Sequence, residues 1–430
     1  MGRANLLQPL PVAAVVLFRE HRPLVRALPV ERARFLRARR RELLLHRAAR
    51  AALARPPAPE TGPRSSTWRT PSMSSRLPGL DGLRALSVVL VILHHAVGTE
   101  GFPRSHTLER IAEAGNIGVQ VFFVISGFLI TWLLLGEEEK TGRIDLKGFY
   151  YRRALRILPP AFVYLAVVAV VANLRDTPIA MRELLSAALF VRNLGPVDST
   201  YTRHYWSLAI EEQFYLVWPL LLMWLPRRAR LWATAGLICA EPVWRQANTW
   251  LLGAAHVNWV RMDLRYSGLL LGALFALVRK EPRLKAKLDR LLAFGPWLFV
   301  AAGVALVALL ATPLDAQPRL FRVDPELLKS LLIVVPLVVL VEGRGGMFSS
   351  VFELAPIRWV GRISYSLYLW QQLFCTTSSG PWFERFPLNV LASFALAAAS
   401  YYFIEQPVLR WRDRRSQKPT LPPAQAPSSN

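Results

Sequence analysis

Arg84 and His95 stand in one apolar segment with ten residues between them. At ~100° per residue, the eleven-residue step returns to nearly the same side of an α-helix, with ~20° of offset, and it separates the two by roughly 16 Å. His94 points about 80° away from that line. Because ionisable groups inside a membrane are costly, this spacing favours a functional site. The alternative is an arginine that snorkels and a histidine that hydrogen-bonds a neighbouring helix.

Two acids open another apolar segment, WSLAIEEQFY, in which Glu211 and Glu212 follow Trp206. A buried carboxylate can accept a hydrogen bond from an imidazolium, orient the neutral imidazole or act as a base. A pair of Glu211 and His95 would suit removal of a proton from a sugar hydroxyl. The run Arg261-Met262-Asp263, ahead of a later apolar segment, has a different interpretation, a structural ion pair at the outer surface.

Three arginines gather at the start of a further apolar segment, FYYRRALRILP. Arg152, Arg153 and Arg156 fall on one helical turn, where forked guanidinium groups could hold the phosphates of a nucleotide-bearing donor. The alternative is that they anchor the helix at the cytoplasmic boundary, as positive residues commonly do.

The composition indicates that these segments lie in a membrane. Of the 430 residues, 53% are hydrophobic, which is high for a soluble domain. The net charge is +24, but the basic residues fall between apolar segments, so they favour membrane topology over nucleic-acid binding. Cys239 and Cys375 both fall inside apolar stretches, so the sequence predicts neither a disulfide framework nor a metal site.

We therefore predict an all-α, polytopic membrane helix bundle with ten transmembrane helices, since a span needs ~20 mostly apolar residues. The segment 181–191 is short and carries Arg182 and Glu183, so we expect it to be interfacial or re-entrant. With this count the basic loops share one side, which predicts that both termini are cytoplasmic. The ten predicted spans are 83–98, 117–135, 155–173, 206–225, 230–247, 264–280, 291–312, 327–342, 359–376 and 387–405.

The first 72 residues differ from the rest of the chain. They contain fifteen arginines, no lysine and four glutamates, with many alanines and prolines, a composition typical of disorder. We expect residues 1–72 to be disordered or to precede the true start, because Met73 opens the segment that leads into the first apolar helix. Residues 73–410 form the predicted membrane domain, and residues 411–430 a disordered cytoplasmic tail.

Taken in order, several motifs resemble the membrane-bound acyltransferase-3 family of inner-membrane O-acyltransferases. The motifs extend from about Pro78 to Arg410 and comprise LDGLRAL with the Arg84–His95 spacing, GVQVFFVISGFLI, FYYRRALRILP, WSLAIEEQFYLVWP, RMD, GRISYSLYLW and IEQP. The resemblance implies a multi-pass enzyme of the cytoplasmic (inner) membrane. Such an enzyme transfers an acyl group, usually acetyl from acetyl-CoA, to a hydroxyl of a carbohydrate or glycosylated acceptor.

The resemblance also implies roles for individual residues. His95 would be the catalytic histidine and Arg84 its paired arginine. Glu211 resembles the acid of the tryptophan-serine-leucine motif. The donor-binding arginines would be Arg152, Arg153 and Arg156.

The sequence departs from the family pattern at two positions. Gln371 stands where a histidine often ends the LYLWH motif, and glutamine carries no proton at neutral pH, so we expect His95 to act without a second histidine. Gln120 stands where an acid is frequent, which predicts a less charged inner cavity. Because the chain ends at Asn430, we expect a stand-alone transferase without a fused hydrolase-like domain.

In the mechanism that these residues favour, CoA phosphates bind the arginines and His95 acts as general base on the acceptor hydroxyl, an effect of ~100- to 10,000-fold. An acyl-histidine intermediate is equally compatible. Glu211 would hold the imidazole, and Arg84, roughly 16 Å away along the helix, would bind the donor tail. The competing hypothesis is a proton-coupled transporter or flippase of a polar or lipid-linked molecule, against which the lack of an inverted internal repeat weighs. CoA binding would discriminate between the two.

Overall fold

The computed structural model describes residues 77, 79–105, 108–110, 114–195, 199–253, 256–311, 325–375 and 381–416. The chain divides into two units, 1–67 and 68–430, and everything described below belongs to the second. The predictions for the extension 1–72 and the start at Met73 lie outside the described residues. Residues 411–430 were predicted to form a disordered tail, but residues 411–416 are helical, because the last described helix ends at Ser416.

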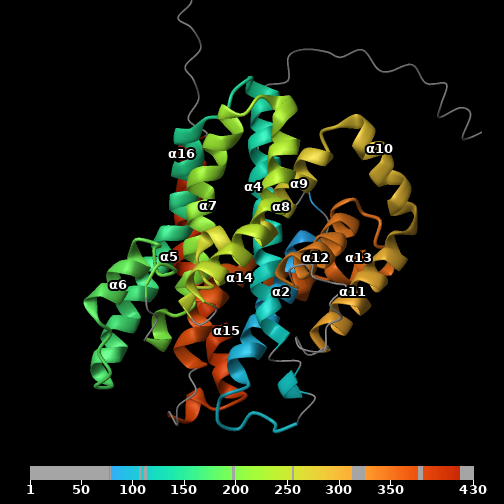
Figure 1. The fold of residues 1–430 in the computed structure, drawn as a ribbon. Coiled ribbons are helices and arrows are strands. Elements are labelled where there is room, and N and C mark those ends of the chain that lie inside the picture. The colour runs from blue at the N-terminus through green and yellow to red at the C-terminus, as the bar shows by residue number, and fades with distance from the viewer. Residues whose placement is uncertain are drawn as a thin grey trace, which may run out of the picture. The chain divides into compact units, whose positions relative to one another are not determined.

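The described residues form helices and no strand, which confirms the predicted all-α class (Figure 1). The short 3-10 helices η3 (Thr200–Thr202) and η5 (Met262–Leu264) lie in loops, and a π-helical turn spans Tyr401–Glu405. The α-helices are α2 (Leu80–Ala96), α4 (Ile117–Thr141), α5 (Leu146–Leu174), α6 (Met181–Ala188), α7 (Tyr205–Trp224), α8 (Arg227–Leu252), α9 (Ser267–Val278), α10 (Pro282–Leu291), α11 (Gly295–Ala311), α12 (Pro325–Val341), α13 (Met347–Phe352), α14 (Ala355–Phe374), α15 (Leu388–Ser400) and α16 (Gln406–Ser416).

Each of the ten predicted spans overlaps one of these helices. Four helical stretches of the described chain, those containing α4, α5, α11 and α15, are long and apolar enough to cross a membrane. The total of ten spans therefore stays a prediction. The segment 181–191 contains only the eight-residue α6, which is too short to cross a bilayer as a helix.

The centre of the bundle is built on α2, α4 and α14. Helix α4 packs against α2 and α9, and α14 packs against α2 and α15. Figure 1 shows α6 on one side of these central helices and α10 and α11 on the other. Arg84 and His95 both belong to α2, so the central packing of this helix positions both side chains.

Glycines allow α4 and α9 to approach closely. A Cβ atom at Gly127 of α4 would collide with the backbone of Leu269 in α9, and one at Gly272 of α9 would collide with the backbone of Val124. Small residues at a helix interface permit such backbone contact in membranes. The small residues of the GVQVFFVISGFLI segment thus lie where another helix approaches closely.

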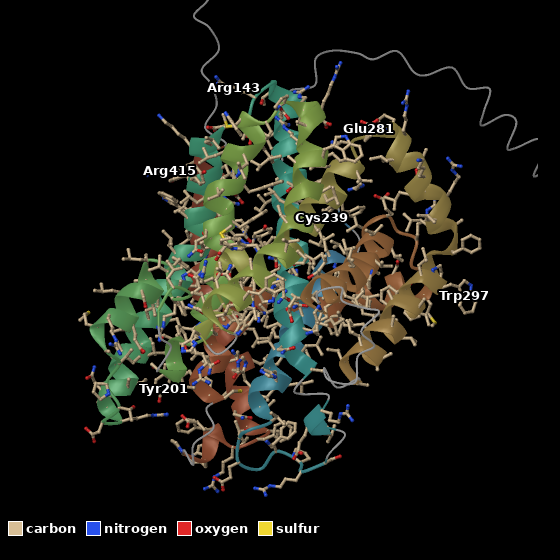
Figure 2. The ribbon with its side chains drawn as sticks, in the orientation of Figure 1. Arg143, Tyr201, Cys239, Glu281, Trp297 and Arg415 are labelled. Atoms are coloured by element: carbon tan, nitrogen blue, oxygen red, sulfur yellow. The ribbon has the colours of Figure 1, made fainter. Side chains whose placement is uncertain are left out.

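The loops that carry the basic residues gather toward one end. Figure 2 shows Arg143, after α4, and Arg415, near the end of α16, at the same end of the view as Glu281, which precedes α10. Tyr201 lies toward the other end. This arrangement supports the prediction that these loops share one side, and the side that faces the cytoplasm stays a prediction.

Candidate functional site

A narrow cavity of about 60 Å³ lies between α2, α4, α5, α7 and α14. It joins side chains from five of the motifs quoted from the sequence. Charged and hydroxyl groups dominate its polar lining, which consists of Arg84, Ser126, Arg153, Arg156, Ser207, Glu211, Glu212, Ser364, Tyr365 and Tyr368. The structure thus brings four of the six predicted site residues to one cavity.

The arginines in this cavity keep unused hydrogen-bonding capacity. The Nε atoms of Arg84 and Arg153 are buried and have no hydrogen-bond partner. The guanidinium carbon of Arg153 lies 3.9 Å from the centre of the Tyr215 ring, which fixes the side chain by a cation–π contact. Because buried polar atoms are nearly always paired, the two free donors fit a ligand with anionic or carbonyl oxygens.

Arg152 does not share this cavity with its neighbours. Its side chain is about half exposed, at 48%, and its Nη2 lies 3.4 Å from a carboxylate oxygen of Glu137 at the end of α4. The helical turn that carries Arg153 and Arg156 into the cavity rotates Arg152 by ~100° from Arg153. Arg152 therefore does not line the cavity with Arg153 and Arg156, and the binding of one donor by all three stays a prediction.

Glu211 does not pair with His95 either. The hydroxyl of Ser126 donates to one carboxylate oxygen and the hydroxyl of Tyr215 to the other, both at 3.1 Å. Charge interactions link Glu211 to Arg153 and Arg84. The carboxylate thus balances the cavity arginines, and the role predicted for it at the imidazole falls to another group.

That group is a backbone carbonyl. The Nδ1 atom of His95 lies 3.0 Å from the carbonyl oxygen of Val91, one helical turn earlier. A carbonyl only accepts hydrogen bonds, so this contact places the proton on Nδ1 and leaves the lone pair on Nε2. The side chain of Gln371 lies beside the ring. His95 is therefore held in the tautomer whose basic nitrogen is Nε2.

A second histidine, His204, lies close to His95 and was missed by the sequence reasoning. It directly precedes α7, is 2% exposed, and interacts electrostatically with His95. Three tyrosine rings surround it edge-on, with centroid distances of 5.3, 5.0 and 5.6 Å to Tyr164, Tyr205 and Tyr368. The available signal was its position two residues before the tryptophan of the WSLAIEEQFY motif.

Glu405, the acid of the IEQP motif, also belongs with the cavity arginines. It is buried, accepts a hydrogen bond of 3.2 Å from the Ser366 hydroxyl, and interacts with the charges of Arg156 and Arg84. The family resemblance assigned no role to this acid. A buried carboxylate beside buried guanidinium groups limits the cost of keeping their charge in the membrane.

Gln120, the second departure from the family pattern, hydrogen-bonds a carboxylate on another helix. Its amide nitrogen donates to Glu326 of α12. Arg265 and Lys329 lie 3.6 and 2.9 Å from the same carboxylate. An acid therefore lies beside Gln120 although position 120 does not supply it. Neither side chain lines the cavity, so the expectation of a less charged inner cavity stays a prediction.

The RMD motif forms the ion pair that the sequence predicted. Arg261 Nη2 lies 2.5 Å from Asp263 Oδ2, and the indole nitrogen of Trp244 donates to the same carboxylate at 2.8 Å. Burial alone would raise the pKa of Asp263, but these hydrogen bonds and the positive charge of Arg261 hold it below its ordinary value. The motif thus fastens the loop before α9 to α8.

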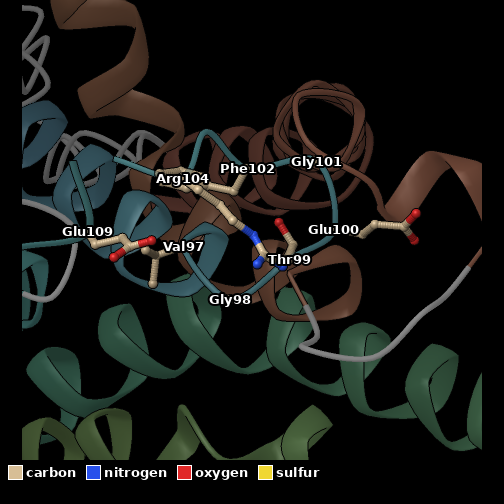
Figure 3. A pocket seen from close by; sticks show the side chains of 8 residues that line it. All are labelled: Val97, Gly98, Thr99, Glu100, Gly101, Phe102, Arg104 and Glu109. Carbon is tan, nitrogen blue, oxygen red and sulfur yellow. The ribbon is translucent and has the colours of Figure 1, made fainter. Parts of the chain in front are cut away.

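A separate hollow of about 340 Å³ lies in the loop that follows α2. Its lining begins at Val97, two residues after His95, and includes Thr99, Glu100, Arg104 and Glu109. Figure 3 shows the Arg104 guanidinium next to Thr99, whereas Glu100 extends away from it. The hollow is polar and adjoins the end of the helix that carries the histidine.

The described residues contain no group of three or more histidine, cysteine or acidic side chains that could hold a metal ion. The cavity combines buried arginines and carboxylates, and His95 belongs to one of the helices that line it. A helical bundle with such a cavity and with apolar helices long enough to cross a membrane fits a membrane enzyme. The acyltransferase domain family matches residues 77–404, and this chain belongs to that family.

The relatives with similar sequences are larger proteins. The peptidoglycan O-acetyltransferase OatA of Listeria monocytogenes is 31% identical over 362 residues, which cover 77% of this chain and 56% of that protein. The putative peptidoglycan O-acetyltransferase YrhL of Bacillus subtilis is also 31% identical, with coverage of 77% and 55%. The O-acetyltransferase OatA of Staphylococcus aureus is 28% identical over 359 residues, with coverage of 77% and 57%.

The chain thus spans somewhat more than half the length of the curated relatives that it matches. No solved structure shows a significant match to it.

Proposed function

We propose that this chain is an O-acetyltransferase that moves an acetyl group from acetyl-CoA to a carbohydrate hydroxyl at the cytoplasmic membrane, with peptidoglycan as the first acceptor to test. The observation that carries the proposal is the cavity in which Arg84, Arg153 and Arg156 meet, lined in part by α2, the helix that also carries His95. Family membership favours this function over the proton-coupled transporter or flippase. The names of the relatives support the acceptor class.

The donor would use the arginines. Its phosphates and carbonyl groups offer acceptors for the buried Nε atoms of Arg84 and Arg153, and guanidinium groups bind such oxygens in a fork. Arg152 would act at the protein surface, where nucleotide phosphates remain in water. The bilayer position and the cytoplasmic entry of the donor rest on the predicted topology.

The acceptor hydroxyl would lose its proton to Nε2 of His95. As the hydroxyl oxygen forms its bond to the acetyl carbon, the carbon–sulfur bond breaks and the CoA thiolate leaves with the proton from His95. The hydrogen bond from Nδ1 to Val91 supports this direction of proton transfer, because it leaves Nε2 as the basic atom. An acyl-histidine intermediate would use the same lone pair.

The acceptor would approach from the opposite end of α2. The polar hollow that begins at Val97 adjoins His95 and contains Glu100, Arg104 and Glu109, side chains of the kind that bind sugar hydroxyls. In the predicted topology this loop lies at the outer face. The proposal therefore places donor and acceptor on opposite sides of the membrane, with His95 between them.

The proposal is tested by mass spectrometry of muropeptides and other envelope glycans. Cells would express the wild type, His95→Ala, His256→Ala or no protein, with equal amounts of each variant in the membrane. His256 is an exposed histidine in the loop after α8 and serves as the matched control. We expect an acetyl increment with the wild type and with His256→Ala only.

Equal acetylation by the wild type and His95→Ala would reject His95 as the base. An envelope without any acetyl increment, together with purified protein that does not bind acetyl-CoA, would reject the transferase and favour the transporter hypothesis. Binding of acetyl-CoA without envelope acetylation would retain the donor and move the search to glycosylated metabolites.

A further inference from the structure

His204 has no task in the mechanism above, yet it is costly to bury. Both of its ring nitrogens are buried and neither has a hydrogen-bond partner. Native structures rarely leave such atoms unpaired, and an exception calls for a functional explanation. A phenylalanine would make the same edge-to-face contacts with the surrounding tyrosine rings without this cost. Packing alone therefore does not account for a histidine here.

Hydrogen bonds connect His204 to the end of the cavity. Its carbonyl oxygen accepts from the Ser207 hydroxyl at 3.0 Å and from the Tyr368 hydroxyl at 3.2 Å. The hydroxyls of Ser207 and Tyr368 also contact each other, and both side chains line the cavity. His204 thus lies directly behind the hydroxyl groups at which the cavity meets α14.

A second unpaired donor lies against the same aromatic group. The indole nitrogen of Trp370 is buried without a partner, and its ring contacts Tyr164 at a centroid distance of 5.3 Å, the same distance as that between Tyr164 and His204. Gln371, the next residue, lies beside His95. The unpaired nitrogens of His204 and Trp370 therefore belong to rings that both lie against Tyr164, whereas the neighbouring hydroxyls of Ser207 and Tyr368 are hydrogen-bonded.

The cavity arginines lie at a different position along the helices from His95 and His204. Glu211, which balances Arg153, lies seven residues after His204 on α7, a rise of ~10 Å. Arg84 lies roughly 16 Å along α2 from His95 by the same rise. These guanidinium groups suit the donor tail. A carbonyl group next to His95 needs a donor of its own, and the N–H of a neutral His204 ring is available there.

We propose that His204 is a further catalytic residue, which donates a hydrogen bond from its ring N–H to the carbonyl oxygen of the acyl group during transfer. This inference rests on the proposed function. When the acceptor oxygen attacks, its proton moves to His95 Nε2 and the carbonyl electron pair moves onto oxygen, where His204 stabilises the negative charge. The pair then returns, the carbon–sulfur bond breaks, and the thiolate takes the proton from His95.

The test compares His204→Phe with His256→Phe in purified, reconstituted protein supplied with acetyl-CoA and soluble peptidoglycan fragments. Loss of one oxyanion donor typically lowers kcat by ~10²- to 10³-fold. We expect a fall of that size in kcat for His204→Phe, little change in KM for acetyl-CoA, and a melting temperature equal to or above that of the wild type. His256→Phe should match the wild type in rate.

A second pair of variants tests the chemistry of the side chain if His204→Phe does not accumulate. His204→Gln retains an N–H donor, whereas His204→Met has similar bulk and no donor. We expect the glutamine variant to retain at least tenfold more rate than the methionine variant. Equal rates for the two would overturn the proposal.

The outcomes separate this inference from the proposed function. If His204→Phe keeps its kcat within a few-fold while His95→Ala is inactive, His204 is a packing residue and the transferase stands. If the wild type itself transfers no acetyl group and binds no acetyl-CoA, the proposed function fails and the role of His204 fails with it. A rise in KM with unchanged kcat would also overturn the assignment, because an oxyanion donor acts in the transition state.

Discussion

Two glycines of α4 are expected to respond in opposite directions to the same substitution. A Cβ at Gly127 would meet the backbone of Leu269 in α9, and backbone atoms cannot turn aside as a side chain can. Gly136 lies nine residues later on the same helix and has no heavy atom within 4 Å of the added Cβ. Gly127→Ala therefore forces α4 and α9 apart, and Gly136→Ala adds a methyl group in open space.

Two contributions to the free energy of unfolding decide the outcome: the first is the same in both variants, and the second applies only to Gly127→Ala. Replacing an interior helical glycine by alanine stabilises the helix by ~0.5–1 kcal/mol at either site. Overpacking at Gly127 costs about 1–3 kcal/mol, and this cost is the expected difference between the variants. At ~2.1 cal/mol/K of unfolding entropy per residue, a unit of roughly 330 residues would show it as a difference in melting temperature of about 1–4 °C.

The assay is thermal unfolding of both purified variants in one detergent, alongside the wild type. Gly136→Ala should melt at or slightly above the wild-type temperature, and Gly127→Ala clearly below Gly136→Ala. Oxidation and detergent affect both variants in the same way, so the difference between their melting temperatures reports the contact between α4 and α9. If Gly127→Ala melted with or above Gly136→Ala, the close packing of α4 on α9 would be refuted.

Three further predictions concern the site. His95→Ala should lower acetyl transfer by ~100- to 10,000-fold in a single-turnover assay while acetyl-CoA binding persists; loss of binding alone would contradict a role as base. Arg153→Gln should raise KM for acetyl-CoA far more than Arg152→Gln, because Arg153 lines the cavity and Arg152 lies at the surface, and equal effects would contradict this division. Gln120→Glu should lower the melting temperature, because it places a second carboxylate beside Glu326. The double variant Gln120→Glu/Glu326→Gln should restore the wild-type melting temperature. An unchanged melting temperature in the single variant would show that the two side chains do not meet.

The sequence predicted the fold class because the apolar segments are long and their boundaries are marked by charged residues. It also predicted that Arg84 and His95 share one helix, since the spacing within a single helix fixes relative direction. The close approach at Gly127 agrees with the small residues of its apolar segment. Each of these features depends on local sequence, where periodicity and composition carry the information.

The partners across helices were harder to predict. The sequence gives Glu211 a face on α7, but which helix meets that face depends on how the bundle packs, and the answer is Ser126 of α4. The hydrogen bond from His95 to Val91 is a backbone contact, which no side-chain motif reveals. His204 precedes its helix, where no periodic pattern applies. The motifs therefore identified site residues, and the structure was needed to show which groups these residues contact.

The pairing changes how the acid and the histidine divide the proposed reaction. Glu211 is committed to Ser126, Tyr215 and the charge of Arg153, and among the described residues no carboxylate is paired with His95 to stabilise an imidazolium. The partners of the ring are the neutral groups of Val91 and Gln371, so a proton taken from the acceptor has no counter-charge at the ring in a buried setting. Passing it on to the leaving thiolate within the same transfer avoids that cost. The proposed reaction therefore favours a histidine that passes the proton on over one that keeps it. The buried carboxylates compensate the charges of the cavity arginines instead.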